Sequence, residues 1–172
     1  MNTVLYSLRE HHAEDLLNET FFREETTIEV KKEALKDVLC FLKESSGFEV
    51  LMDLTAVDYS VPNKQVRLVY WLHHPVDYFK IRIVTFVGRE DLVPSVSCLW
   101  PGAAWYEREL YDLFGVSFEG HPDLKRILMP DDWQGHPLRK DYPLTEQKVA
   151  FKNEAKPKIP SQILHLKQHQ KL

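Results

Sequence analysis

The fold is decided by residues 31–87, which read KKEALKDVLCFLKESSGFEVLMDLTAVDYSVPNKQVRLVYWLHHPVDYFKIRIVTFV. Apolar side chains recur at helical spacing in the first part of this stretch: Leu35, Val38, Leu39 and Leu42. The spacing predicts an amphipathic helix over about 31–45, ended by Gly47.

Three segments that follow are rich in Val, Ile, Leu and aromatic residues and predict strands: 49–59, 65–73 and 78–87. The turn material that separates them is short enough for hairpins. A helix followed by such a meander predicts an α+β layer, in which the helix lies over an antiparallel or mixed sheet.

The N-terminal residues add a second helix and a further extended piece. Asn2 or Thr3 can cap a helix that runs to about Leu17, and Thr, Ile and Val favour an extended conformation at 26–30. After the meander, residues 88–94 read as a polar link. The expected fold class is α+β, with two helices packed on a mostly antiparallel or mixed sheet, followed by a motif-bearing helix, rigid turns and an extended C-terminal arm.

Residues 100–144 carry the densest mixture of aromatic side chains, charges, Gly and Pro in the chain. An amphipathic helix is predicted over 103–114, and Gly115 is placed to end it in a left-handed conformation. Trp105 falls on the polar side of this helix with Glu109, so side chains on two faces of the helix are suited to burial. A surface helix needs only one such face.

Two similar turns follow the predicted helix. Gly120-His121-Pro122 and Gly135-His136-Pro137 each precede a leucine and two cations, and the proline stiffens each turn. The cations are Lys125, Arg126, Arg139 and Lys140. Rigid irregular segments that carry paired cations suit recognition of the carboxylates of a partner.

The length and the charge distribution of the chain limit its possible domain organisation. The chain has 172 residues, of which 44% are hydrophobic, which is enough for one core with extensions. Residues 1–146 carry 25 acidic and 16 basic side chains, whereas residues 147–172 carry six lysines and one glutamate. An acidic body argues against binding of nucleic acid. We expect an α+β domain at 1–99, an interface segment at 100–144 and a basic tail at 145–172, either solvated or ordered along a partner.

No targeting or membrane-spanning segment is recognisable. The N-terminus carries Glu10, Glu14 and Asp15 and lacks the pattern of a secretory or transit peptide. The apolar runs are far shorter than the roughly 20 residues that span a bilayer. We expect a soluble chain that reaches a membrane only through a partner. Cys40 and Cys98 lie in apolar surroundings and are expected to be buried thiols in a reducing compartment.

No cofactor site is recognisable either. The glycines form neither GxGxxG nor a Walker loop, and two isolated cysteines cannot hold an iron–sulfur cluster. His74, His121 and His136 each precede a proline, which points to turn geometry rather than to metal ligation. We therefore expect no cofactor, no metal ion and no electron carrier in this chain.

The acidic side chains of the predicted 103–114 helix allow two interpretations. Glu107 and Asp112 could act as an acid and base pair in catalysis, or Arg108 and Asp112 could form an i,i+4 ion pair worth about 0.3–0.5 kcal/mol. We favour structural or interfacial ion pairing, since burial of Glu107 without a donor would be unfavourable. The role of three tryptophans stays open between core aromatic and interface anchor: Trp100, Trp105 and Trp133.

These residues resemble a known family. In order and spacing, the chain is similar to the C-type or thirty-kilodalton-type component of the proton-pumping NADH:quinone oxidoreductases, known as respiratory complex I. The flanking segments 54–59, 93–96, 99–103 and 131–143 are similar to the family pattern. The residues that carry the signature, or that we assign to an interface, are Trp105, Glu107, Arg108, Glu109, Asp112, Phe114, Gly115, Phe118, His121, Pro122, Arg126, Trp133, His136 and Arg139.

The resemblance implies a cofactor-free subunit of the hydrophilic peripheral arm, on the cytoplasmic face of the cell membrane. It also implies packing against the D-type or forty-nine-kilodalton subunit that lines the quinone site. Catalysis would belong to the complex, with NADH, FMN, iron–sulfur clusters and quinone bound by partner subunits. The missing transit peptide favours a bacterial version. Two alternatives remain: the equivalent subunit of a ferredoxin-dependent plastoquinone reductase or membrane-bound hydrogenase, and a stand-alone enzyme that uses Glu107 and Asp112.

Overall fold

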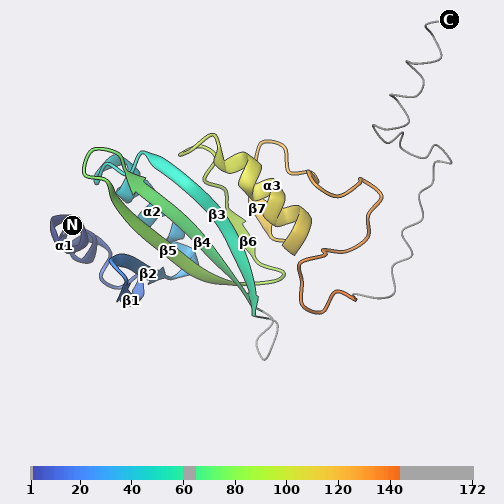
Figure 1. The fold of residues 1–172 in the computed structure, drawn as a ribbon, viewed down its shortest axis with the longest axis horizontal. Helices are drawn as coiled ribbons and strands as arrows, with labels where there is room; N and C mark the ends of the chain where they lie inside the picture. Colours follow the sequence, from blue (N-terminus) through green and yellow to red (C-terminus); the bar gives the residue numbers. More distant parts are fainter. Residues whose placement is uncertain (1, 60–64, 144–172) are drawn as a thin grey trace, which may run out of the picture. The chain divides into compact units, whose positions relative to one another are not determined.

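The computed structural model describes residues 2–59 and 65–143 (Figure 1). Residues Met1–Tyr142 form one compact unit, and the predicted tail at 145–172 lies outside the described residues. The elements in chain order are α1 (Asn2–His12), β1 (Leu16–Phe22), β2 (Glu25–Val30), the 3-10 helix η1 (Lys32–Ala34), α2 (Leu35–Glu44), β3 (Val50–Tyr59), β4 (Gln65–His74), β5 (Phe79–Gly88), β6 (Leu92–Pro94), α3 (Ala103–Phe114) and β7 (Ser117–Glu119).

The main sheet has five strands in the order β1-β2-β5-β4-β3. β3, β4 and β5 form the predicted antiparallel meander, in which Tyr70 of β4 lies between Leu54 of β3 and Ile83 of β5. β2 runs parallel to β5 and antiparallel to β1, so the sheet is mixed. The predicted α+β class is confirmed (Figure 1).

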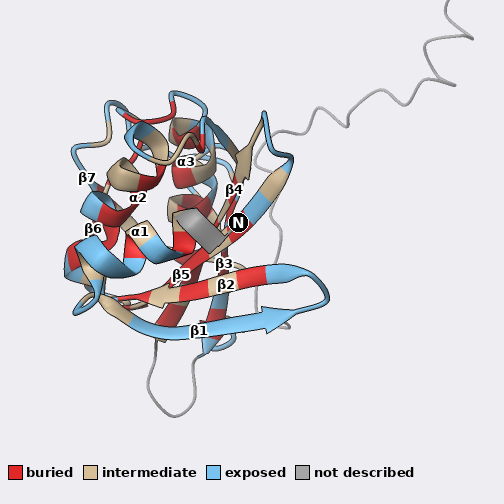
Figure 2. Ribbon diagram, turned by 90° about the vertical axis from the view of Figure 1, so that its left-hand side faces the viewer, coloured by how far each residue is buried: buried red, intermediate tan, exposed pale blue. Residues whose placement is uncertain are grey.

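The core lies between one face of this sheet and the helices. Along β4 every second residue is buried, at Val66, Leu68, Tyr70 and Leu72, as expected when only one face of a strand is covered. The predicted stripe of α2 is buried against this face: Leu35, Val38, Leu39 and Leu42 each have an exposed fraction of 0%. Each such leucine contributes about 1.5–3 kcal/mol through removal of apolar surface from water. In Figure 2, buried positions (red) lie where the helices face the sheet.

The N-terminal prediction was wrong in its boundary. α1 ends at His12, where the backbone N–H of Asp15 donates to the carbonyl of His12, and a strand then begins at Leu16. The apolar spacing in 13–17 resembled a further helical turn, but pairing with β2 decides the conformation of 16–22. Sheet formation depends on a partner strand that is not visible in local periodicity.

Two smaller predictions also differ from the structure. The polar link at 88–94 contains β6, which pairs in parallel with β7 to form a two-stranded sheet. Three residues are too few for a periodic signal in the sequence. Cys40 is only partly buried and Cys98 is exposed, because Cys98 lies in a turn just before α3 rather than in a strand. The prediction that both thiols are buried was therefore wrong.

Candidate functional site: helix α3 and the segment bound to it

Helix α3 has the predicted bounds and buries two sides. Its apolar side carries the buried Leu110 and Phe114 into the core, while Glu107 and Asp112, both with an exposed fraction of 0%, are buried elsewhere on the helix. Gly115 ends the helix at φ +72°, and its N–H donates to the carbonyls of the last turn. The helix lies beside β3, where the hydroxyl of Tyr106 donates to the carbonyl of Met52 at 3.2 Å.

Asp112 organises the chain that follows α3. Its Oδ2 atom accepts hydrogen bonds from three consecutive backbone N–H groups, those of Ile127 (3.0 Å), Leu128 (2.7 Å) and Met129 (2.8 Å). Its Oδ1 atom accepts a bond of 2.6 Å from the guanidinium of Arg126. Burial raises the pKa of Asp112, but the bonds from Met129, Arg126 and the other two amides outweigh it and hold the pKa below its usual value.

Arg126 extends this network to the next turn. Besides Asp112, it donates to the carbonyls of Trp133 and Gly135, each at 3.0 Å. His136 Nδ1 donates to the backbone carbonyl of Asp112 at 2.9 Å, because a carbonyl can only accept. Burial lowers the pKa of His136 below its usual value; the hydrogen bond to the Asp112 carbonyl opposes this shift, and the charges of Arg139 and Arg126 add to it.

Arg139 closes the network at the C-terminal end of α3. Its guanidinium donates to the carbonyls of Phe114 (2.6 Å) and Gly115 (3.3 Å). The last carbonyls of a helix have no partners within the helix and carry partial negative charge, so a cation there is favourable. We call the residues Asp112, Arg126, His136 and Arg139 the Asp112 network. It fixes the irregular segment 124–139 to α3.

The predicted ion pair between Arg108 and Asp112 does not form. Arg108 instead donates to the carbonyls of Lys125 (3.1 Å) and Arg126 (2.9 Å) and lies 5.0 Å from the ring centre of Trp105. Asp112 instead accepts from the three backbone N–H groups of 127–129 and from the guanidinium of Arg126. The cations of the two turns also differ from our interpretation, because Arg126 and Arg139 bind groups of their own chain.

Glu107 anchors the other side of α3. Its carboxylate accepts bonds from the Ser95 hydroxyl (2.6 Å) and the Val96 N–H (2.7 Å), and so ties the helix to the chain after β6. Burial raises the pKa of Glu107, although Ser95, Val96 and His121 oppose this shift. Burial and the charge of Glu107 raise the pKa of Tyr70, whose hydroxyl has no hydrogen-bond partner among the described residues.

His121 lies beside Glu107. Its Nε2 atom is 3.9 Å from the Glu107 carboxylate, but it donates to the carbonyl of Ala104 at 3.0 Å. Its Nδ1 atom accepts the N–H of Asp123 at 3.0 Å. The first Gly-His-Pro turn is therefore attached to the N-terminal half of α3, and the second to its C-terminal end.

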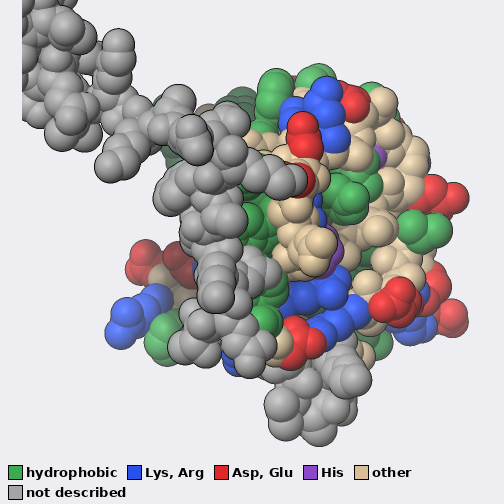
Figure 3. Space-filling model, turned by 90° about the vertical axis from the view of Figure 1, so that its right-hand side faces the viewer, with side chains coloured by type: hydrophobic (Ala, Val, Ile, Leu, Met, Phe, Trp, Pro, Cys, Tyr) green, Lys and Arg blue, Asp and Glu red, His purple; other side chains and the backbone are tan. Residues whose placement is uncertain are grey.

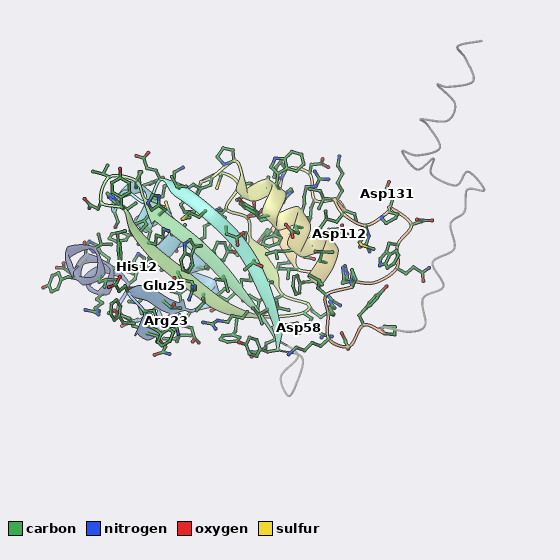
Figure 4. The ribbon with its side chains drawn as sticks, in the orientation of Figure 1. His12, Arg23, Glu25, Asp58, Asp112 and Asp131 are labelled. Atoms are coloured by element: carbon green, nitrogen blue, oxygen red, sulfur yellow. The ribbon has the colours of Figure 1, made fainter. Side chains whose placement is uncertain are left out.

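An ion-pair cluster that the sequence did not predict holds the end of the segment. Arg89 pairs with Asp58 at 3.2 Å and with Asp141, and the N–H of Lys140 donates to Asp58 at 2.8 Å. Asp58 ends the series of buried positions Leu54, Ala56 and Asp58 in β3. That alternation places a carboxylate on the buried face, which was the signal that a cation had to lie nearby. Figure 4 shows Asp58 at one end of β3 and Asp112 on α3.

Several apolar side chains of this region are exposed. The exposed fractions are 60% for Trp105, 61% for Leu128, 51% for Leu138 and 37% for Ile127. We call these four residues the α3 surface. Backbone bonds to Asp112 fix Ile127 and Leu128, and the guanidinium of Arg108 lies against Trp105. Figure 3 shows hydrophobic side chains next to Lys and Arg on the part of this face that is not covered by grey atoms.

The predicted site residues therefore divide into groups. Trp105, Glu109 and Pro122 are exposed, whereas Glu107, Asp112, Phe114 and Phe118 are buried. The others are partly buried: Arg108, Gly115, His121, Arg126, Trp133, His136 and Arg139. Within residues 2–59 and 65–143, no group of three or more His, Cys, Asp or Glu side chains is placed to hold a metal ion. None of the helices in this part of the chain is long and apolar enough to cross a membrane.

Gly115 is required by both its backbone and its surroundings. A Cβ atom there would lie 2.2 Å from Nη2 of Arg139 and 2.6 Å from Cδ2 of His136. We expect Gly115→Ala to lower the free energy of unfolding by about 2–3 kcal/mol, through strain at positive φ and displacement of Arg139. Gly120→Ala is the matched control, because φ is +77° but no atom lies within 4 Å of its Cβ position. It should lose only about 1 kcal/mol in a urea titration, and equal losses would contradict the prediction.

Comparison with known proteins identifies the family. The family model described as the respiratory-chain NADH dehydrogenase 30 Kd subunit matches residues 28–148. The C-type component of the NADH-quinone oxidoreductase of Geobacter sulfurreducens is 45% identical over 145 residues, which cover 83% of this chain and 90% of that protein. The corresponding protein of a Roseiflexus species is 42% identical over 155 residues, 87% of each chain.

Two further proteins are similar to the chain. A probable mitochondrial NADH-ubiquinone oxidoreductase 30.4 kDa subunit of Candida maltosa is 42% identical over 149 residues, 86% of this chain and 54% of that protein. A chain from the structure of the membrane-bound sulfane sulfur reductase, an archaeal respiratory membrane complex, has a TM-score of 0.74 at 25% identity, covering 92% of this chain and 98% of that one. As its signature residues predict, the chain belongs to the family of the 30 kDa subunit of respiratory-chain NADH dehydrogenase.

Proposed function

We propose that this chain is a cofactor-free subunit of the peripheral arm of a proton-translocating NADH-quinone oxidoreductase. It supports the D-type subunit that lines the quinone site, and thereby electron transfer from NADH to quinone. NADH, FMN, iron–sulfur clusters and quinone are bound by partner subunits. The chain is held at the cytoplasmic face of the cell membrane through the complex, with no direct contact with lipid.

The observation that carries this proposal is the rigid surface built on α3. Asp112, Arg126 and Arg139 fix a long irregular segment to the helix, yet the segment leaves Leu128 and Leu138 exposed. Rigid apolar anchors lose little conformational entropy on binding, which favours a stable protein interface. A stand-alone enzyme using Glu107 and Asp112 is disfavoured, because both carboxylates are fully buried and bonded to groups of their own chain.

Binding of the purified chain to the D-type subunit tests the proposal. We expect Trp105→Ala and Leu128→Glu to weaken association of the full-length chain at least tenfold, as expected for central interface anchors. Val76→Glu is the matched control, since Val76 is 77% exposed in the turn between β4 and β5 and lies outside the α3 surface. Affinity is measured by titration of the purified chain against the D-type subunit. Wild-type affinity in both α3 variants would refute the proposed docking surface.

One observation favours a second candidate. The similar chain from an archaeal sulfane sulfur reductase supports membership of a related machine, such as a ferredoxin-dependent plastoquinone reductase or a membrane-bound hydrogenase, in which the subunit has an equivalent place. The purified complex distinguishes the two. Oxidation of NADH with quinone as acceptor supports the first candidate, whereas activity only with reduced ferredoxin supports the second.

A further inference from the structure

The sheet has an open edge at β1. β1 stands first in the strand order, and in the described part of the chain β2 is the only strand that pairs with it. Six of its seven residues are exposed, whereas β2 carries the buried Thr26, Ile28 and Val30. Figure 2 shows β1 exposed beside β2. A long, exposed edge strand presents unpaired backbone donors and acceptors to another chain.

The hairpin geometry identifies which groups are free. Arg23 and Glu24 form a two-residue connection with φ of 50° and 66°, as in a type I′ turn. Such a turn makes the flanking residues, Phe22 and Glu25, the first hydrogen-bonded pair of the hairpin. The pairs then alternate along the two strands between hydrogen-bonded and non-hydrogen-bonded.

This alternation assigns the remaining residues of β1. Thr20, opposite Thr27, falls in the next hydrogen-bonded pair, so its backbone N–H and C=O groups point toward β2. Phe21 and Glu19 fall between, so their N–H and C=O groups point away from β2 toward the open edge. A strand added at this edge would form its backbone bonds with these two residues.

The side chains around this edge have the composition of an interface. Four large hydrophobic residues are more than half exposed: Tyr6, Leu17, Phe21 and Phe22. Acidic residues occur in the same helix, strands and turns: Glu10, Glu14, Asp15, Glu19, Glu24, Glu25 and Glu29. The pairs Arg9–Glu19 and Arg82–Glu25 neutralise two of these carboxylates, and the other five still outnumber Arg23, the remaining Arg or Lys of residues 2–30. An apolar centre with an acidic rim complements an apolar segment with basic flanks.

We propose that β1 binds an extended segment of another subunit of the complex, an apolar strand flanked by Lys or Arg, which adds to the sheet through the backbone of Glu19 and Phe21. This contact goes beyond the docking surface at α3. Figure 4 places Arg23 and Glu25 of the hairpin on the opposite side from Asp112, so both surfaces can be occupied at once.

Residue-resolved hydrogen exchange of the free full-length chain and of the assembled complex tests the added strand. We expect the amides of Glu19 and Phe21 to exchange rapidly in the free chain and at least tenfold more slowly in the complex. The amides of Thr20 and Phe22 should be protected in both, which serves as an internal control. Unchanged exchange at Glu19 and Phe21 in the complex would overturn the proposal. So would protection of these amides in the free chain that rises with its concentration, since the edge would then pair with a second copy.

A pair of variants separates backbone bonding from side-chain burial. Phe21→Ala removes the ring but keeps the N–H, whereas Phe21→Pro removes both. Proline is tolerated at an edge position whose N–H is not bonded within the sheet, so the two free variants should unfold at similar urea concentrations. When each is co-expressed with a tagged wild-type chain, we expect the proline variant to be incorporated into the complex several-fold less than the alanine variant. Equal incorporation would overturn the proposed backbone pairing, and the exchange experiment on the wild-type chain decides the question if the proline variant does not fold.

Discussion

Asp112→Asn is expected to lower the free energy of unfolding by about 3 kcal/mol, the lower end of the range for breaking a buried ion pair. The amide would keep the shape of Asp112, and its oxygen could accept from the N–H groups of 127–129, but its NH2 group would then face the guanidinium of Arg126, donor against donor. Arg126, whose side chain is only 16% exposed, would lose its carboxylate partner. A urea titration measures the loss, and Asp123→Asn is the control, because Asp123 is exposed and its pair with Lys125 should contribute little.

The same pair of proteins gives a pH test. The pKa of Asp112 is lower in the folded chain than the value of about 3.9 in an unfolded chain. Its contribution to stability is therefore fully present above about pH 4 and is lost as the pH falls through the folded pKa. We expect the deficit of Asp112→Asn to shrink as the pH is lowered from 4 toward 3. A deficit that stays constant over this interval would show that the charge of Asp112 does not stabilise the fold.

The regular elements could be predicted because their signals are local or nearly local. The stripe of α2, the strands of the meander and the Gly115 terminus of α3 each follow from a period or from one backbone preference. Hairpin strands are close in sequence, so their pairing is also implied by the turns. The boundary between α1 and β1 could not be predicted in this way. The periodicity at 13–17 fits a helix or a strand, and only the pairing with β2 decides between them.

The candidate site could be located but not resolved from the sequence. Its residues were found through their types and their resemblance to a family, but the pair predicted for Asp112 was wrong, and the hydrogen-bond partners of the other residues were not predicted. Asp112 bonds to backbone groups 15 to 17 residues away, whereas helical spacing suggested Arg108. Backbone N–H groups carry no signature in the sequence, so a carboxylate that binds them cannot be distinguished from one that binds a cation.

Glu107→Ala is expected to lower the free energy of unfolding by about 2–4 kcal/mol. The substitution leaves the Ser95 hydroxyl and the Val96 N–H without their acceptor in a buried site, and it opens a cavity beneath α3. Glu107→Gln separates charge from shape. Its Oε1 atom can accept from Val96 and its Nε2 atom can donate to Ser95, so both bonds are retained without a buried charge.

The pH dependence of Glu107→Gln should be opposite to that of Asp112→Asn. The pKa of Glu107 is raised above the value of about 4.3 in an unfolded chain. The stabilisation from its neutral form is therefore fully present below about pH 4 and is lost as the pH rises through the folded pKa. Glutamine stays neutral throughout, so the stability of Glu107→Gln relative to wild type should increase between pH 4 and pH 7 in urea titrations. A relative stability that falls over this interval would mean that the buried site favours the carboxylate, as at Asp112, and that the two sides of α3 are anchored by the same electrostatics.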